Sequence, residues 1–157
     1  MPRTVSAAAR IALQAPSTGE AFIPLVTITH APTNDVFRVC ANTEKIVSRG
    51  QVFTPHAFTI TLPVESGEEL GSVEFQLDNT TLLLVDMLRR ITEPAAFLLE
   101  IVLASSPDSP EYTIADLLLR EVSWDASAIT GRLLLDDVLN QRFPRDVYDP
   151  IQFPGLF

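Results

Sequence analysis

The sequence predicts a mainly β fold, an antiparallel β-sandwich or barrel that carries two short helices. Three observations support this class. Residues 22–30, 58–63 and 72–78 alternate apolar and polar side chains, as half-buried strands do. Clusters of proline, glycine, asparagine and aspartate separate these apolar segments, which is typical of turns. The clearest helix signals are confined to residues 6–15 and 79–94. We therefore expect roughly eight strands and two helices in one layered domain.

The N-terminal segment predicts a short helix over residues 6–15, SAAARIALQA. Ser6 can cap this helix, its alanines favour it, and Pro16 ends it. Ile11 lies on a face made otherwise of alanine. The segment lacks the long apolar block of a secretory signal. We expect residues 1–19 to form a surface helix and a linker, in preference to an amphipathic targeting helix.

The main domain is expected over residues 20–140, beginning with a strand at 22–30, FIPLVTITH. Residues 36–41 should return as its hairpin partner, and a second hairpin should turn at Ser48–Gly50, where glycine supplies a positive φ. In the two alternating strands that follow, the side chains expected to point inward are Phe58, Ile60, Leu62, Val73, Phe75 and Leu77.

The second half of the domain contains the clearest helix signal, NTTLLLVDMLRRITEP, from which we predict a helix over 80–92. Its Leu84, Leu88 and Ile91 fall on one stripe. Residues 96–105 should form a strand buried on both faces, and SPDSPEY at 106–112 should form a turn. Two further strands are expected at 113–124 and 128–140, although their leucine runs are also compatible with helix.

The composition disfavours nucleic-acid binding and membrane insertion. Twenty acidic residues against eleven basic ones give a net charge of −9, whereas a protein that grips phosphates needs a basic surface. No apolar run approaches the roughly 20 residues of a membrane span. All basic residues except Lys45 are arginine, which is either typical of protein interfaces or a codon bias of a GC-rich genome.

No arrangement of side chains in the sequence predicts catalysis, so we expect no enzyme, no cofactor and no metal. Cys40 lies in an apolar strand and should be a buried small hydrophobe. His30 and His56 lack metal-ligand spacing and should be surface or capping residues. Phosphate-binding glycine loops, dinucleotide fingerprints and serine nucleophile elbows are absent. The adjacent carboxylates at 68–69 and 136–137 should lie in solvated turns.

The last segment, residues 141–157, should be an extended arm. It has three prolines and three phenylalanines without periodicity, so it is neither helix nor strand, yet it is too apolar for a free tail. A stiff apolar arm loses little entropy when it docks. It should therefore lie against its own barrel or against a neighbouring subunit.

Several of these segments together resemble a known protein family. The order IPLVTITH, FTITLP, VEFQLDN, a helix, LLEIVLAS, ITGRLLLDDVLNQRFP and a terminal FPGLF is similar to a family of siphophage minor tail and tail-tip proteins described only as a domain of unknown function. The resemblance covers nearly the whole chain after residue 20. It implies a tail-tube-like β-barrel and a structural role without catalytic residues.

The resemblance also implies a place in the virion. The protein would be a distal-tail-type ring, usually a hexamer, that joins the tail tube protein to the hub or baseplate around the DNA channel, with the tape measure protein as a further neighbour. DNA would pass through without specific binding, no membrane would be involved, and assembly would start in the host cytoplasm. A tail-tip hub or tail-completion protein of other symmetry is one alternative. A soluble β-sandwich that binds sugar or protein is another.

Two sets of residues are candidates for sites in such a ring. Acidic side chains that repel phosphate should face the lumen, unless they belong to an ordinary solvated loop; these are Glu65, Glu68 and Glu69. The terminal arm should form the contact between subunits or layers. Its candidate interface residues are Phe143, Pro144, Phe153, Pro154, Gly155, Leu156 and Phe157.

Overall fold

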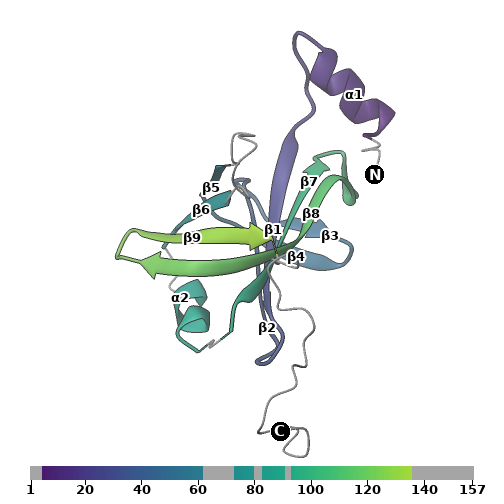
Figure 1. Ribbon diagram of the computed structural model, residues 1–157. Helices are drawn as coiled ribbons and strands as arrows, with labels where there is room; N and C mark the ends of the chain where they lie inside the picture. Colours follow the sequence, from purple (N-terminus) through teal and green to yellow (C-terminus); the bar gives the residue numbers. More distant parts are fainter. Residues whose placement is uncertain (1–4, 62–72, 80–82, 91–92, 136–157) are drawn as a thin grey trace, which may run out of the picture.

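A computed structural model describes residues 5–61, 73–79, 83–90 and 93–135. Within these ranges, nine strands form a single sheet accompanied by two helices (Figure 1). The first half comprises α1 (Ala7–Gln14), β1 (Phe22–His30), β2 (Asp35–Cys40), β3 (Ile46–Ser48), β4 (Gln51–Pro55) and β5 (Phe58–Thr61). The second half comprises β6 (Val73–Asp78), α2 (Leu83–Leu88), β7 (Ala95–Leu103), β8 (Ser106–Trp124) and β9 (Ala128–Leu135). The mainly β class is confirmed.

The strands follow the order β3-β4-β2-β1-β7-β8-β9-β6-β5 across the sheet. Their pairs are antiparallel, as expected, with the exception of β2 and β4, which are parallel. This pair is short and joins Val39 to Thr54 and Cys40 to Pro55. The β3–β4 hairpin therefore attaches to the sheet by the far end of β4 and leaves β3 at an edge.

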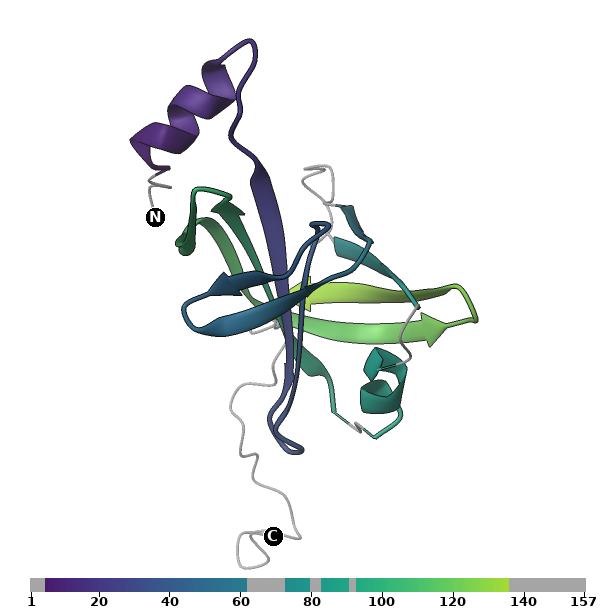
Figure 2. The same cartoon turned by 180° about the vertical axis from the view of Figure 1, so that it is seen from behind.

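The sheet curls so strongly that its two halves face each other like the layers of a sandwich (Figures 1 and 2). Apolar side chains from both halves fill the space between them and form the main core. Its fully buried aromatic rings are Phe75 of β6 and Phe97 of β7, whose centroids lie 5.0 Å apart in an edge-to-face arrangement. Helix α2 adds Val85 and Leu88 to this core.

A second, smaller core lies on the other face of β1, where the β3–β4 hairpin crosses it (Figure 2). Strand β1 serves both cores because its buried side chains change face along the strand. Ile23 and Leu25 belong to the second core, whereas Val26 and Ile28 belong to the main core. Phe53 of β4 is the largest buried side chain of the second core. The hairpin is thus packed onto the sheet by its own apolar contacts.

The predictions for β5, β6 and the second hairpin are confirmed for the described residues, whereas Leu62, also expected to point inward, lies outside them. Strand β6 alternates buried and exposed residues along its whole length, with Val73, Phe75 and Leu77 inward. In β5 the threonines are exposed, while Phe58 and Ile60 pack against the main core. The β3–β4 turn places both Arg49 and Gly50 at positive φ, at 49° and 74°.

The turn predicted at residues 106–112 is wrong, because the first part of β8 occupies this segment. Prolines 107 and 110 are accommodated by irregular pairing with β7, where Val102 lies opposite Pro110 and Leu103 lies opposite Ser106. Two further irregularities in β8 follow from Asp116 and Glu121, which have φ of 62° and 50°. Such bulges increase the local twist that a curled sheet needs.

The second helix is shorter than the predicted span of 80–92. Helix α2 ends at Leu88, and residues 89–90 form a turn. The Nε atom of Arg90 donates to the carbonyl of Asp86 at 3.1 Å, so a side chain satisfies a carbonyl near the helix end. The guanidinium of Arg90 then reaches Asp35 at 3.5 Å, which ties α2 to the start of β2. Ile91 lies outside the described residues.

Candidate functional site

The residues predicted to form sites lie outside the described part of the chain. Residues 62–72 contain the three glutamates expected at the lumen, Glu65, Glu68 and Glu69, and residues 136–157 contain the terminal arm. The arm's seven candidate interface residues are Phe143, Pro144, Phe153, Pro154, Gly155, Leu156 and Phe157. Both assignments stay predictions.

The reactive side chains that the structure describes have structural environments. Cys40 is fully buried, as predicted, and burial raises the pKa of its thiol, which keeps it protonated. Its Sγ lies 3.7 Å from the carbonyl oxygens of Glu44 and Phe53. The described ranges hold no group of three or more His, Cys, Asp or Glu side chains suited to a metal ion. No helix in those ranges is long and apolar enough to cross a bilayer.

The two histidines differ from each other. His30 is buried, because it ends β1 on the same face as Ile28, so the expectation of a surface position is wrong and that of a capping role remains. Its Nδ1 lies 2.8 Å from the hydroxyl of Thr33, and this hydroxyl donates to Asp35 at 2.8 Å. The imidazole therefore closes the β1–β2 turn by donating from Nδ1. His56 is half-buried and meets the ring of Phe37 edge to face.

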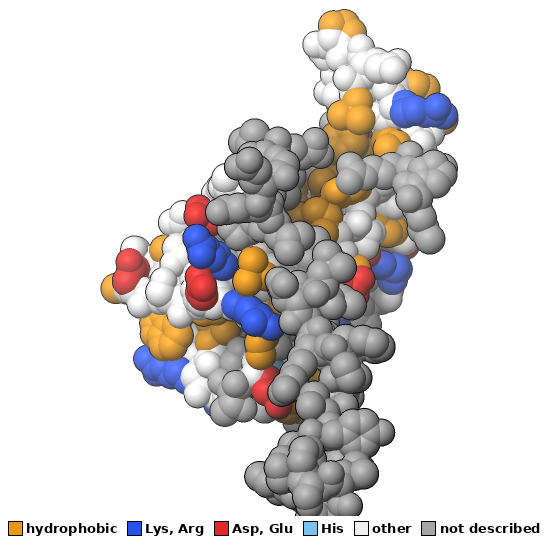
Figure 3. All heavy atoms as spheres, viewed as in Figure 1, with side chains coloured by type: hydrophobic (Ala, Val, Ile, Leu, Met, Phe, Trp, Pro, Cys, Tyr) orange, Lys and Arg blue, Asp and Glu red, His pale blue; other side chains and the backbone are white. Residues whose placement is uncertain are grey.

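Helix α1 presents the first exposed apolar surface, and its orientation is the reverse of an ordinary amphipathic helix. Its alanines at 9 and 12 face its own chain and are buried, whereas Ile11 and Leu13 are 70% and 66% exposed. Burial of each of these two side chains would be worth about 1.5–3 kcal/mol. Figure 3 shows apolar and basic side chains together on this helix, whose one charged residue is Arg10. Leu13 points to a different side of the helix from Ile11, because residues two positions apart do not share a helix face. We call Arg10 and Ile11, which are neighbours on one side of α1, the helix patch.

A hydrogen bond joins the start of α1 to the sheet, although α1 stands at one end of the molecule (Figure 1). Ser6 caps the helix by accepting from the amide of Ala9 at 3.1 Å, as predicted. The Ser6 amide donates to the carboxylate of Glu111 on β8 at 2.8 Å. An acidic group at this end also suits the helix dipole.

The segment that follows α1 is fixed as well. Ala104 donates to the carbonyl of Ala21 at 2.9 Å, and the Ser105 amide donates to Glu20 at 3.1 Å. Hydrogen bonds from the side chain and backbone of Ser105 lower the pKa of Glu20. The β7–β8 hairpin thus contacts the chain on both sides of α1, through Glu111 of β8 and through Ala104 and Ser105 at its turn.

The β3–β4 hairpin presents the second exposed apolar surface. Val47 and Val52 lie opposite each other in the register and both point away from the second core. We call these two residues the hairpin patch.

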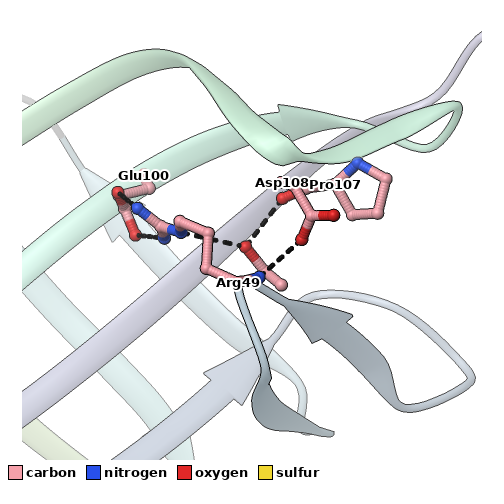
Figure 4. A network of polar contacts seen from close by, with 5 residues as sticks. Arg49, Glu100, Pro107 and Asp108 are labelled. Atoms are coloured by element: carbon pink, nitrogen blue, oxygen red, sulfur yellow. Dashed lines mark hydrogen bonds and ion pairs between the residues drawn. The ribbon is translucent and has the colours of Figure 1, made fainter.

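A polar clasp fixes this hairpin over the sheet (Figure 4). The guanidinium of Arg49 binds Glu100 of β7 through two hydrogen bonds of 2.9 and 2.5 Å, which raise the pKa of Arg49. The carboxylate of Glu100 is buried, so this bidentate pairing satisfies a charge that would otherwise be costly. Ser48 donates to the carbonyl of Pro107 at 2.7 Å, and the backbone amide of Arg49 donates to Asp108. The hairpin is fixed to β7 and β8 by both side chains and backbone.

The turn between β8 and β9 presents a third surface, on the side of the sheet remote from α1 (Figures 1 and 2). Trp124 is 43% exposed here. The next residue, Asp125, accepts from the amides of Ser127 and Ala128, each at 2.7 Å. These bonds, that of Ala128 foremost, lower the pKa of Asp125 and keep it ionised. We call Trp124 and Asp125 the turn patch.

These three surfaces were not foreseen as sites. The sequence predicted a helix in which Ile11 lies among alanines. It did not predict that a different face of this helix, with Ala9 and Ala12, would be the buried one. The pairing of Val47 with Val52 could have been read from the predicted hairpin. Which face of the hairpin is buried depends on how the hairpin packs on the sheet, and the sequence pattern does not show this. Trp124 carries no signal of its own.

Comparisons with known proteins place this geometry among related folds. The family model described as "Domain of unknown function (DUF1833)" matches residues 8–148. Among the matching solved structures is a chain of "Virion of native gene transfer agent (GTA) particle", with a TM-score of 0.64 and 18% identity over 92% of the present chain. The present chain spans about half, 50%, of the length of that chain. No curated protein matches. At this identity the structural likeness shows a common fold.

Proposed function

The chain belongs to the family described as "Domain of unknown function (DUF1833)", and from this premise we propose that it is a structural component of a phage-like virion. The observation that carries the proposal is the fold shared with a chain of the gene transfer agent virion across 92% of this protein. Exposed large apolar side chains on α1, the β3–β4 hairpin and the β8–β9 turn also support it, because a subunit of an assembly must offer contacts to its neighbours.

Within such a particle we propose a distal-tail-type ring that connects the tail tube to the hub. The resemblance of IPLVTITH, VEFQLDN and FPGLF to tail-tip proteins supports this finer role. A curled β sheet with unlike surfaces on different sides is also suited to head-to-tail contacts, which close into a ring when the rotation between copies allows. The ring would be a hexamer, and its partners would be the tail tube protein and the hub protein.

The charge of the chain fits a channel through which DNA passes without binding. At −9 per copy, six copies would carry about −54, and an acidic lumen repels phosphates. In this proposal Glu65, Glu68 and Glu69 line the lumen. A map of the assembled ring tests it directly, since these three side chains at the outer rim would contradict the assignment.

Mass spectrometry and cryo-electron microscopy of purified particles test the main proposal. We expect peptides of this protein in intact particles and density for its sheet in the tail, near the junction of tube and hub. Absence from particles would overturn the virion role. Density at a lower-symmetry hub would overturn the ring while leaving a virion role in place. A purified monomer that binds sugars or unrelated proteins would favour the soluble β-sandwich instead.

The terminal arm can be tested separately. Deletion of residues 150–157 should abolish assembly and leave the β-sheet signal in circular dichroism unchanged, because the proposed role of the arm is contact between subunits or layers. Val36→Ser, which changes an exposed apolar residue elsewhere, is a matched control that should still assemble. Normal particles from the truncated protein would contradict the role of the arm.

A further inference from the structure

We propose that the helix patch of one copy docks on the turn patch of the next copy, so that α1 is the projecting half of the contact between neighbouring subunits. This inference rests on the proposed function, because it names a contact within the assembly. The occupant of the helix patch would be a second copy of this chain, bound through Trp124 and Asp125.

The first step is the direction in which α1 presents its side chains. A short helix that buries two alanines and exposes Ile11 and Leu13 gains little for its own domain from these large side chains. Glu111 holds the start of α1, and Glu20 with Ala21 holds the segment after it. These hydrogen bonds restrict α1 at both ends in the free chain, so it would lose less conformational freedom on docking than an untethered helix.

The second step is the position of the turn patch. Both ribbon views place α1 and the β8–β9 turn on opposite sides of the sheet (Figures 1 and 2). Hydrogen bonds hold this turn in its conformation. Asp125 accepts three of them from Ser127 and Ala128. The side chain of Asn79 donates another to the carbonyl of Asp125 at 2.8 Å. Unlike surfaces on opposite sides produce a head-to-tail contact that repeats from copy to copy.

The third step is that the helix patch and the turn patch carry opposite charges beside exposed apolar side chains. Arg10 is the one charged residue of α1, and Asp125 is an ionised carboxylate with no cation bound to it among the described contacts. Glu121, which also lies near the end of β8, is already paired with Arg132 at 3.1 Å. Tryptophan and arginine are the side chains that most often dominate interfaces. Arg10 would meet Asp125 while Ile11, its neighbour on the same side of the helix, covers Trp124.

The hairpin patch is the competing partner for α1, and it is less suitable. The residues just before it are Glu44 and Lys45, whose charges cancel, and Arg49 is already bound to Glu100. Asp108 also lies beside the hairpin, but it accepts from the Arg49 amide and faces the charge of the Arg49 guanidinium. The hairpin patch therefore offers Arg10 no carboxylate without a cation close to it. In the views of Figures 1 and 2 the β3–β4 hairpin also lies on the same side of the sheet as α1, whereas a repeating contact needs the two halves on different sides.

Disulfide trapping tests whether the two patches are in contact and whether the contact is head-to-tail. The double variant Ile11→Cys with Trp124→Cys, oxidised with copper phenanthroline, should give a ladder of cross-linked oligomers on non-reducing gels. Cys40 is fully buried and should not contribute. A mixture of the two single variants should stop at dimers, because each copy then carries only one half of the contact. The matched control, Ile11→Cys with Val47→Cys, should give no ladder.

The cross-linking is carried out on the purified protein and on particles that contain the variants. Two results overturn the inference. One is a ladder from the variant with Val47→Cys and none from the variant with Trp124→Cys. The other is the absence of cross-links from the Trp124→Cys variant in both preparations. If the protein is present in particles but does not cross-link, the inference fails and the proposed function stands. Absence of the protein from particles instead contradicts the proposed function.

A charge reversal provides a second measurement that does not need cysteine. Arg10→Glu should lower the oligomeric fraction in analytical ultracentrifugation at least fivefold at low salt, with a smaller effect at high salt. Lys45→Glu is the matched control, since it makes the same change beside the hairpin patch. Equal effects of both variants would mean that only net charge matters and would contradict the proposed pairing.

Discussion

The two helices are similar in length but use their apolar residues in opposite ways. Helix α2 turns Val85 and Leu88 into the main core, where both are buried. Helix α1 buries only alanines and leaves Ile11 and Leu13 in solvent. The apolar residues of α2 therefore stabilise the fold, while those of α1 are available for contact with another molecule. The number of apolar residues in a helix does not distinguish these two roles. They are distinguished by which face of the helix packs against the rest of the domain.

The largest effect should come from truncating the helix that faces the core. Leu88→Ala removes a buried side chain and leaves a cavity, so we expect a loss of about 2–5 kcal/mol in the free energy of unfolding. Leu13→Ala is the matched change on α1 and should cost less than about 0.5 kcal/mol. Urea denaturation measures both. Similar losses from the two variants would remove the distinction between the helices.

A smaller effect is expected where the main core is closely packed beneath the β8–β9 hairpin. A Cβ at Gly131 would lie 2.6 Å from Cδ1 of Leu119, which is itself buried. Gly131→Ala should therefore cost about 1–3 kcal/mol in unfolding free energy, because Leu119 must shift in a filled interior. Gly19→Ala, where a Cβ meets nothing within 4 Å, should be close to neutral. A neutral Gly131→Ala would mean that this part of the core is loosely packed.

The cap of α1 should have a local effect of about 1 kcal/mol. Ser6→Ala removes the bond from the Ala9 amide, so α1 should open more often while the sheet stays intact. Hydrogen exchange should be faster at the α1 amides, and exchange in β7 should not change. Ser6→Thr keeps the capping oxygen and is the control. Equal acceleration in β7 would show that α1 is part of the cooperative core.

The smallest effect should be the acid sensitivity of the segment after α1. The pKa of Glu20 is lowered below its ordinary value of 4.5, so its bond to Ser105 contributes fully above that value. The contribution is lost as the pH falls through the lower, folded pKa. The amide resonance of Ser105 in nuclear magnetic resonance spectra should therefore shift below pH 4.5. In Glu20→Gln this shift should be absent; its persistence would assign the transition to another carboxylate.

Much of the fold could be predicted from local sequence. Alternation specified β6 and β5 with their inward residues, Ser6 specified the start of α1, and Gly50 specified the β3–β4 turn. The errors arose where distant contacts changed local tendencies. The proline-rich segment 106–112 is strand, because β7 accepts it through irregular pairing. Helix α2 ends early, where the Arg90 side chain replaces helical bonding and reaches Asp35.

The candidate sites were less predictable. The composition of the chain together with the family resemblance pointed to the terminal arm and to Glu65, Glu68 and Glu69, and these remain predictions. It did not point to the exposed surfaces at α1, the β3–β4 hairpin and the β8–β9 turn. Exposure of Val47 or Trp124 depends on which neighbouring strands cover them, and that is a property of the whole sheet.

The sequence by itself determined the mainly β class, the alternation of the strands, the cap of α1 and the acidic charge, because each depends on residues close together in the chain. Only the tertiary structure decided which apolar side chains became core and which stayed at the surface. Burial requires a second surface, and the surfaces that cover Val85 and leave Ile11 exposed come from strands far away in the sequence.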